Sequence, residues 1–188
     1  MELIDSLIYF KKVFGRQGHD LGSFQIGTEF SNLETLEQMY NILLFTKTLT
    51  VGGEFFMNLY PQSMLQKIQQ GWYMILSKEK QWTSDDIHWN KQWIVFATRN
   101  DDAIFYNQID GGVYGSVEKK MFYKLSSTLS IFFYVLSKCM EMEENVFHFN
   151  TSNDDEEPIK IFLERTREIL SLNMELKNVA EFMNFFFA

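Results

Sequence analysis

Cysteine and histidine are scarce in this sequence of 188 residues, which contains one Cys and three His. A single cysteine cannot form an intramolecular disulfide, and the apolar neighbours of Cys139 predict an inert buried thiol. A metal site of the zinc type needs several converging ligands. His88 follows Asp85 and Asp86 closely, but no second His or Cys lies at ligand spacing. We therefore expect no metal site and no cofactor.

Catalytic motifs are missing as well. There is no Gly-x-Ser-x-Gly elbow, and Gly111-Gly112 lies in a predicted hairpin turn, not between a strand and a helix as in a phosphate loop. The adjacent carboxylates Asp85-Asp86 and Asp101-Asp102 are typical of solvated turns. The sequence thus favours a protein that binds over one that catalyses. An enzyme of unfamiliar type is an alternative that requires a deep pocket with converging polar groups around His88.

Long apolar runs are absent, and none approaches the roughly 20 residues of a membrane-spanning helix. Acids follow Met1 where a secretory signal would carry Lys or Arg, so we expect a cytoplasmic protein that does not enter a membrane.

Only 2 Pro and 10 Gly are present, whereas 19 Phe supply ample material for a core. We expect one domain at residues 1–140, followed by an acidic linker and an amphipathic helical tail at residues 141–188.

Negative charge is concentrated near the C-terminus of the chain, whose net charge is −8. Residues 1–140 carry 13 Lys or Arg and 14 Asp or Glu, whereas residues 141–188 carry 4 and 11. A negative field repels nucleic-acid phosphates and attracts basic partners. Direct binding of DNA or RNA is therefore disfavoured, and a protein partner with a basic surface is favoured.

The first half of the chain predicts three helices. Apolar spacing indicates a short helix over residues 2–14, and Ser31-Asn32-Leu33-Glu34 has the form of a capping box, which predicts a helix beginning at its serine. Residues 54–60 predict a strand or extended segment. Pro61 suits the first turn of a third helix, whose apolar stripe continues to Leu76.

From Trp93 the pattern changes to short apolar runs separated by turn residues. Residues 93–97, 103–106 and 113–117 predict three strands. Strands joined by such short turns must be antiparallel, so we expect a meander around residues 93–117. With helices packed against this mostly antiparallel sheet, the fold class is α+β with a C-terminal helical extension.

The last third of the chain predicts further helices. Ser126 or Ser127 is expected to cap a helix that extends to Cys139. The acidic segment 153–158 predicts a solvated linker, and the stripes beyond it fit one long amphipathic helix or two short ones. This tail either packs on the domain or docks on a partner; packing is favoured because its phenylalanines in water would invite aggregation. Trp82 and Trp89 flank a polar loop and are expected to be partly exposed.

Several short motifs occur in an order similar to that of a known family. Gly52-Gly53 leads into Phe55-Phe56-Met57-Asn58-Leu59-Tyr60-Pro61, similar to the family's glycine pair and its entry into the second helix. Its strand–turn–strand block and final helix correspond to residues 93–97, 102–107, 112–114 and 129–133. On these motifs, residues 31–139 resemble the SUKH superfamily of bacterial immunity proteins. The resemblance implies an α+β fold and a non-catalytic protein that neutralises a cognate toxin by binding it.

We therefore expect an immunity-type protein whose partner is a toxin, of which a nuclease with a basic substrate groove is one candidate. Acids that project from turns and from the linker are the candidate contacts. They are Asp101, Asp102, Asp110, Asp154, Asp155, Glu156 and Glu157. The simpler interpretation of each is an ordinary solvated loop acid. The alternative function is an intracellular scaffold or regulatory module whose partner is unrelated to toxins.

Overall fold

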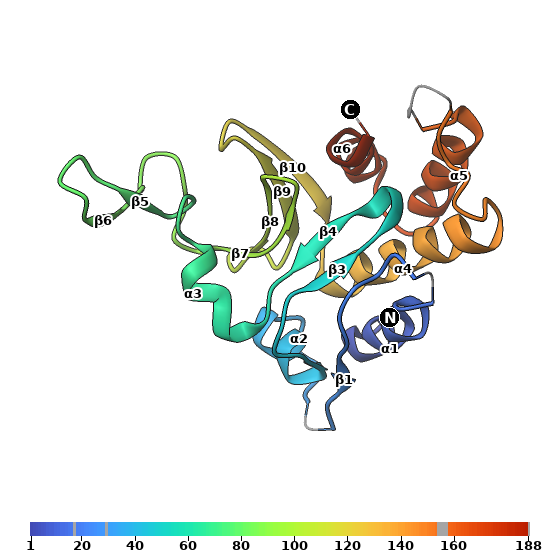
Figure 1. Ribbon diagram of the computed structural model, residues 1–188, viewed down its shortest axis with the longest axis horizontal. Helices are drawn as coiled ribbons and strands as arrows, with labels where there is room; N and C mark the ends of the chain where they lie inside the picture. The colour runs from blue at the N-terminus through green and yellow to red at the C-terminus, as the bar shows by residue number, and fades with distance from the viewer. Residues whose placement is uncertain (17, 29, 154–157, 188) are drawn as a thin grey trace.

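The computed structural model is an α+β fold built on a six-stranded antiparallel sheet in the order β10-β9-β8-β7-β4-β3 (Figure 1). The structure describes residues 1–16, 18–28, 30–153 and 158–187. Helices α1, α4, α5 and α6 lie to one side of the sheet, and a long arm that contains β5 and β6 extends on the opposite side, where α3 leads into it (Figure 1). The predicted fold class is therefore confirmed.

The predicted meander is also confirmed, and it continues for one strand more than the pattern indicates. Its strands are β7 (Trp93–Arg99), β8 (Asp102–Asn107), β9 (Val113–Val117) and β10 (Met121–Ser126). Asn100, in the β7–β8 turn, has φ of 50°, a left-handed conformation that Asn adopts more readily than most residues. β10 is exposed at its start and buried at its end instead of alternating, which hides it from a period-two pattern.

A glycine pair connects the two remaining strands of this sheet, β3 (Leu49–Val51) and β4 (Met57–Leu59), through a 3-10 turn at Gly53–Phe55. A Cβ atom on Gly52 would lie 2.5 Å from the Cβ atom of His19. Gly53 has φ of 68°, and a Cβ atom there would overlap the carboxylate of Glu143. Both positions therefore require glycine.

Two long helices, α1 (Leu3–Val13) and α4 (Leu129–Asn145), pack against each other beside the sheet and supply much of the main core. α1 is the predicted first helix. The cap of α4 is Thr128, whose hydroxyl accepts a hydrogen bond from the backbone N–H of Ile131 at 3.2 Å. The predicted cap at residues 126–127 is wrong, because the Ser126 hydroxyl donates to the carbonyl of Thr128 instead.

The helix predicted to begin at Ser31 begins later, as α2 (Leu36–Ile42), with Thr35 as its cap. The capping-box prediction is wrong because Glu34 contacts a distant segment. Its carboxylate accepts a hydrogen bond from the backbone N–H of Ser130 at 3.1 Å, at the start of α4. A tertiary contact thus overrides the local signal.

The helix predicted to reach Leu76 ends early, as a 3-10 turn at Gln62–Met64 followed by α3 at Leu65–Ile68. The side-chain amide of Gln69 then pairs with the backbone of Val95: its nitrogen donates to the carbonyl at 2.9 Å, and its oxygen accepts from the N–H at 3.1 Å. Val95 lies beside a bulge in β7, where strand pairing is irregular. The long-helix prediction is wrong beyond α3 because Gln69 is bound to the sheet.

The C-terminal extension consists of two helices, α5 (Lys160–Ser171) and α6 (Leu176–Phe187). Their apolar stripes belong to the main core, where the rings of Phe55 and Phe186 lie 5.8 Å apart. Arg99 on β7 donates a hydrogen bond to the carbonyl of Phe186 at 2.7 Å. The extension therefore lies against the sheet and α4. No helix in the described part of the chain is long and apolar enough to cross a membrane.

A carboxylate is buried near the C-terminal end of α4. Glu143 is 1% exposed, and its Oε1 atom accepts a hydrogen bond from the backbone N–H of Glu54 at 3.0 Å. Its Oε2 atom has no hydrogen-bond partner among the described residues. Burial, with the nearby carboxylates of Glu54 and Asp20, outweighs the hydrogen bond and raises the pKa of Glu143 to about 7. The ionised form is therefore disfavoured in the folded protein.

We predict that Phe186→Ala lowers the free energy of unfolding by about 3–5 kcal/mol, the usual cost of deleting a buried phenyl ring. Urea unfolding followed by circular dichroism and by tryptophan fluorescence should give one shared transition, shifted in both signals. Leu172→Ala is the control, because Leu172 is 85% exposed. A helical signal that weakens while the fluorescence transition stays in place would instead make the C-terminal helices a separate unit.

We predict that Glu143→Gln stabilises the protein at pH 8 but not at low pH. The raised pKa means that the folded protein holds a proton that the unfolded chain has lost between about pH 4.5 and about pH 7, so stability falls as pH rises through this window. The variant removes this loss, worth up to about 3 kcal/mol at about 1.4 kcal/mol per pKa unit. Thermal unfolding at pH 4.5 and pH 8 measures the difference. Equal effects at both pH values would contradict the assignment.

Candidate functional site

The sheet has a second apolar face on the side away from the main core. Alternation along β8 directs Ile104 and Tyr106 into the main core, and Ala103 and Phe105 to the opposite face. On that face, six aromatic residues form what we call the outer aromatic cluster: Trp72, Trp89, Trp93, Phe105, Tyr114 and Phe122. A sheet that is apolar on both faces needs a cover on each.

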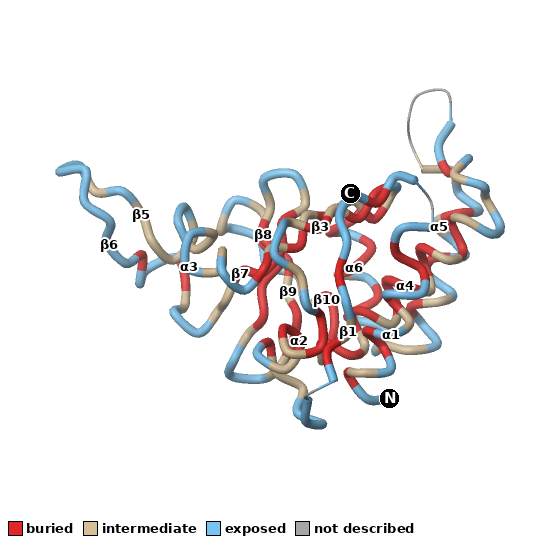
Figure 2. Tube along the Cα trace, turned by 60° about the horizontal axis from the view of Figure 1, so that its bottom comes forward, coloured by how far each residue is buried: buried red, intermediate tan, exposed pale blue. Residues whose placement is uncertain are grey.

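An arm comprising residues 69–92 covers part of this second face. It turns away from the sheet at Gly71, which has φ of 91°, and contains the antiparallel hairpin of β5 (Met74–Leu76) and β6 (Trp82–Ser84). Figure 1 shows this hairpin extending beyond the rest of the molecule, and Figure 2 shows that it is largely exposed. The tip of the arm is therefore exposed to solvent.

The anchor of the arm is Trp89, which is 2% exposed. Its indole N–H donates to the carbonyl of Trp93 at 3.0 Å, and its ring lies 5.0 Å from the ring of Phe105. The expectation that Trp89 is partly exposed is wrong, because its loop folds back onto the sheet. The same expectation for Trp82 is confirmed, since this residue is 47% exposed in β6.

An ion pair, which we call the arm latch, holds the arm to the β9–β10 turn. Lys119 Nζ lies 2.7 Å from Asp85 Oδ2 and donates to the carbonyl of Trp72 at 2.6 Å. Asp85 is 7% exposed, and its other oxygen contacts the His88 ring at 2.8 Å. The hydrogen bond from Lys119, assisted by His88, lowers the pKa of Asp85 to about 2. Among the described residues, no group of three or more His, Cys, Asp or Glu side chains is placed to hold a metal ion.

The structure brings two of the predicted contact acids together beside this latch. Asp101 is exposed in the β7–β8 turn and lines a hollow with Trp72, Glu118 and Lys119. Asp102 is half-buried, and burial, followed by the charges of Asp101 and Glu118, raises the pKa of its carboxyl. Asp101 therefore lies at the rim of the outer aromatic cluster, whereas the alternation along β8 places Asp102 on the same side as Ile104 and Tyr106.

Asp110 lies at the opposite end of β8 from Asp101, in the β8–β9 turn. It accepts hydrogen bonds from the Tyr114 hydroxyl at 2.6 Å and the Gly112 N–H at 3.0 Å, and pairs with Lys124 at 3.1 Å. Burial works against ionisation, but these donors together hold the pKa of Asp110 below its usual value. Its carboxylate thus already has three partners within the turn and the neighbouring strand. The other predicted acids, at residues 154–157, lie outside the described residues.

Apolar side chains remain exposed on the arm and beside the aromatic cluster. Ile87 is 88% exposed, Leu76 is 55% exposed and Phe122 is 39% exposed. A hollow of about 630 Å³ between the arm and the sheet is lined by Ile87, Trp89, Trp93, Lys119 and Phe122, among others. We call the exposed part of the arm, the hollow and its rim the arm face. The sequence pattern missed this face because it predicted a helix where β5 lies.

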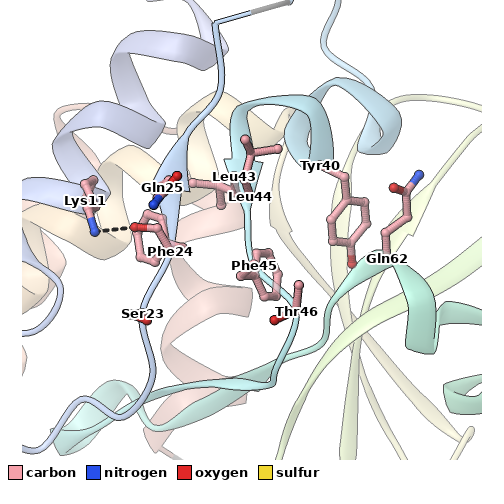
Figure 3. A pocket seen from close by; sticks show the side chains of 10 residues that line it. All are labelled: Lys11, Ser23, Phe24, Gln25, Tyr40, Leu43, Leu44, Phe45, Thr46 and Gln62. Atoms are coloured by element: carbon pink, nitrogen blue, oxygen red, sulfur yellow. Dashed lines mark hydrogen bonds between the residues drawn. The ribbon is translucent and has the colours of Figure 1, made fainter.

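A larger hollow, of about 760 Å³, lies elsewhere, beside the two-stranded pairing of β1 (Gln25–Ile26) with β2 (Leu43–Leu44) (Figure 3). Figure 3 shows the Lys11 ammonium directed at the carbonyl of Phe24, to which it donates a hydrogen bond. The hydroxyl of Tyr40 donates to a backbone carbonyl at 2.8 Å. These polar groups already bond within the protein, and none of the three described contact acids, Asp101, Asp102 and Asp110, lines this hollow.

Comparison of the chain with protein-family models, curated proteins and solved structures finds no match.

We predict that Lys119→Met releases the arm without unfolding the sheet. The variant leaves Asp85 mostly buried without its cation, which is a costly state. Amide hydrogen exchange in residues 72–89 should accelerate by about tenfold or more, while exchange in β8 stays slow. Lys120→Met is the matched control, because Lys120 is 76% exposed and pairs with an exposed glutamate. Unchanged exchange in the arm would show that the latch does not hold it.

In the unchanged protein, the low pKa of Asp85 should keep the latch closed above about pH 4 and open it as pH falls toward about 2.

Proposed function

We propose that this protein is a cytoplasmic, non-catalytic binding protein, and specifically an immunity protein that neutralises a bacterial toxin by direct contact. The observation that carries the proposal is the arm face. It exposes Leu76, Trp82, Ile87 and Phe122 beside a half-covered aromatic cluster. Exposed apolar groups of this kind, surrounded by charged residues, are typical of protein-interaction sites.

The composition of the arm face supports a protein partner. Protein interfaces are enriched in Trp, Tyr and Phe at their centre and are polar at their rim. Here the aromatic cluster occupies the centre, and Asp101, Glu118, Lys119 and Lys120 lie in turns at one end of the sheet. A few buried aromatic anchors commonly carry most of the binding energy. The partner would therefore present a shallow apolar surface that accommodates the arm.

Charge supports a partner that is basic overall. The chain has a net charge of −8, most of it carried by residues 141–188, and the arm face combines the acids Asp86, Asp101 and Glu118 with Lys91 and Lys119. A field of this sign accelerates encounter with a basic protein, such as a nuclease with a phosphate-binding groove, and disfavours nucleic acid itself. In this scheme the net charge sets the rate of association, and the outer aromatic cluster sets the lifetime of the complex.

The resemblance to the SUKH superfamily is the reason for specifying a toxin. The motifs that carry it lie on α2, the Gly52-Gly53 turn, β4, the β7–β9 meander and the first turn of α4. A binding module with a partner unrelated to toxins would use the same arm face. The two functions differ in which neighbouring gene product forms the complex.

The test is co-expression with the toxin encoded beside this gene. We expect restored growth and a stable complex on a sizing column. Ile87→Asp should weaken the complex at least about tenfold, because it places a charge in an apolar contact. Leu172→Asp is the matched control: Leu172 is 85% exposed but lies after α5, away from the arm face. Undiminished killing with no complex would refute the toxin partner, and equal effects of the two variants would refute the arm face.

A further inference from the structure

A further cavity, of about 270 Å³, lies where the β3–β4 connection meets the end of α4 and the segment that follows it. Its wall includes the aromatic rings of His19 and Phe149, the carboxylates of Glu54 and Glu143, and the hydroxyl residues Thr151 and Ser152. The centroids of the His19 and Phe149 rings lie 5.1 Å apart. The cavity thus combines an aromatic side with an acidic one.

Glu143 supplies the observation that points to a ligand. Glu143 is one of the residues that line the cavity, it is 1% exposed, and its Oε2 atom is buried without a hydrogen-bond partner among the described residues. A buried carboxylate is costly unless a cation or a full set of donors satisfies it. Its other oxygen, Oε1, accepts a hydrogen bond from the backbone N–H of Glu54.

Two arginines that bond to residues beside Glu143 or in the cavity wall have other partners. Arg16 forms ion pairs with Glu141 and Glu144, at 3.8 Å and 3.1 Å. Arg99 donates to backbone carbonyls, including that of Glu54 at 3.0 Å. Within the described chain, then, no lysine or arginine forms an ion pair with Glu143, while the carboxylates of Glu54 and Asp20 act on it with the same sign of charge. Asp20 is itself bonded to the N–H groups of the Gly15 and Gly52 backbone.

The backbone at the aromatic side of the cavity is strained. His148 and Phe149 both have left-handed conformations, with φ of 48° and 63°. Such conformations cost free energy in residues other than glycine, and they tend to occur at functional sites. Here they set the Phe149 ring against His19. Thr151 and Ser152 follow, and their hydroxyls donate to Glu54 Oε1 at 2.7 Å and 2.8 Å, which fixes the second carboxylate.

We propose that this cavity binds a guanidinium group, either of a free small molecule or of an arginine side chain on a protein partner. Guanidinium is planar, stacks on aromatic rings and forms paired hydrogen bonds with carboxylates. An ammonium group is more strongly hydrated and gains less from an aromatic wall. The chemistry of the cavity therefore fits arginine better than lysine. The protein-partner source rests on the function proposed above, whereas the small-molecule source does not.

Binding should depend on pH, because the cation prefers the ionised carboxylate. The pKa of Glu143 is raised to about 7, so ionisation increases about tenfold between pH 6 and pH 8. The titratable groups that face Glu143 are Glu54 on the β3–β4 connection, His19 and Asp20 on the segment before β1, and Cys139 on α4 itself. Affinity should therefore rise with pH across this range, with a proton released on binding.

The experiment is isothermal titration of the full chain with L-arginine amide at pH 6 and pH 8. We expect saturable binding that is about tenfold tighter at pH 8. L-citrulline amide, whose side-chain urea is neutral and similar in shape to guanidinium, and L-lysine amide should bind at least about tenfold more weakly. Glu143→Gln should abolish the pH dependence of binding and weaken the binding of arginine amide at least about tenfold at pH 8. Glu164→Gln is the matched control, because Glu164 is 53% exposed on α5. A thermal melt at pH 4.5 shows whether the Gln variant is folded.

The outcomes separate this inference from the proposed function. Absence of saturable arginine amide binding at pH 8, or equal binding by citrulline amide, would overturn the guanidinium site whether or not a toxin complex forms. If arginine amide binds and Glu143→Gln also weakens the toxin complex, the ligand is a partner arginine. If arginine amide binds and the toxin complex is unaffected by Glu143→Gln, or does not form, the ligand is a small molecule.

Discussion

The central constraint on this structure is a sheet that is apolar on both faces. On the inner face, α1, α4 and the C-terminal helices bury the strand residues completely, and Phe96, Ile104 and Val113 are inaccessible to solvent. On the outer face, the described residues that cover the sheet are Ile68 at the end of α3 and the arm, whose Trp89 is buried against the sheet while Phe122 remains exposed. The surface that we propose for binding exists because the second cover is incomplete.

A small number of long-range polar contacts decide where the covering segments lie. Gln69 pairs with Val95, Lys119 pairs with Asp85, and the Glu181 carboxylate accepts a hydrogen bond from the backbone N–H of Lys124 at the free side of β10. The last contact also occupies a donor on an edge strand, which discourages pairing with another chain. Each of these contacts joins segments distant in sequence and replaces what local propensity alone would form.

The two proposed binding sites lie in different parts of the molecule and use different chemistry. The arm face is aromatic, whereas the cavity at Glu143 is smaller and acidic and lies between α4 and the Gly52-Gly53 turn. Steric contacts explain why glycine is required at both positions of this pair. A side chain on Gly53 would overlap the Glu143 carboxylate, so the same contact shapes the turn and leaves one carboxylate oxygen unsatisfied.

The sequence by itself determined the fold class, the meander from Trp93 to Val117 and the first helix, because alternation and turn chemistry act between near neighbours along the chain. It also identified Trp82 as exposed. Only the tertiary structure decided that the helix after Pro61 stops at Ile68, that Trp89 is buried, and that Asp110 is bonded within its own hairpin while Asp101 remains exposed. Glu143 gave no sequence signal at all. Its burial depends on segments that precede it by about 90 residues or more, and no local pattern encodes such a contact.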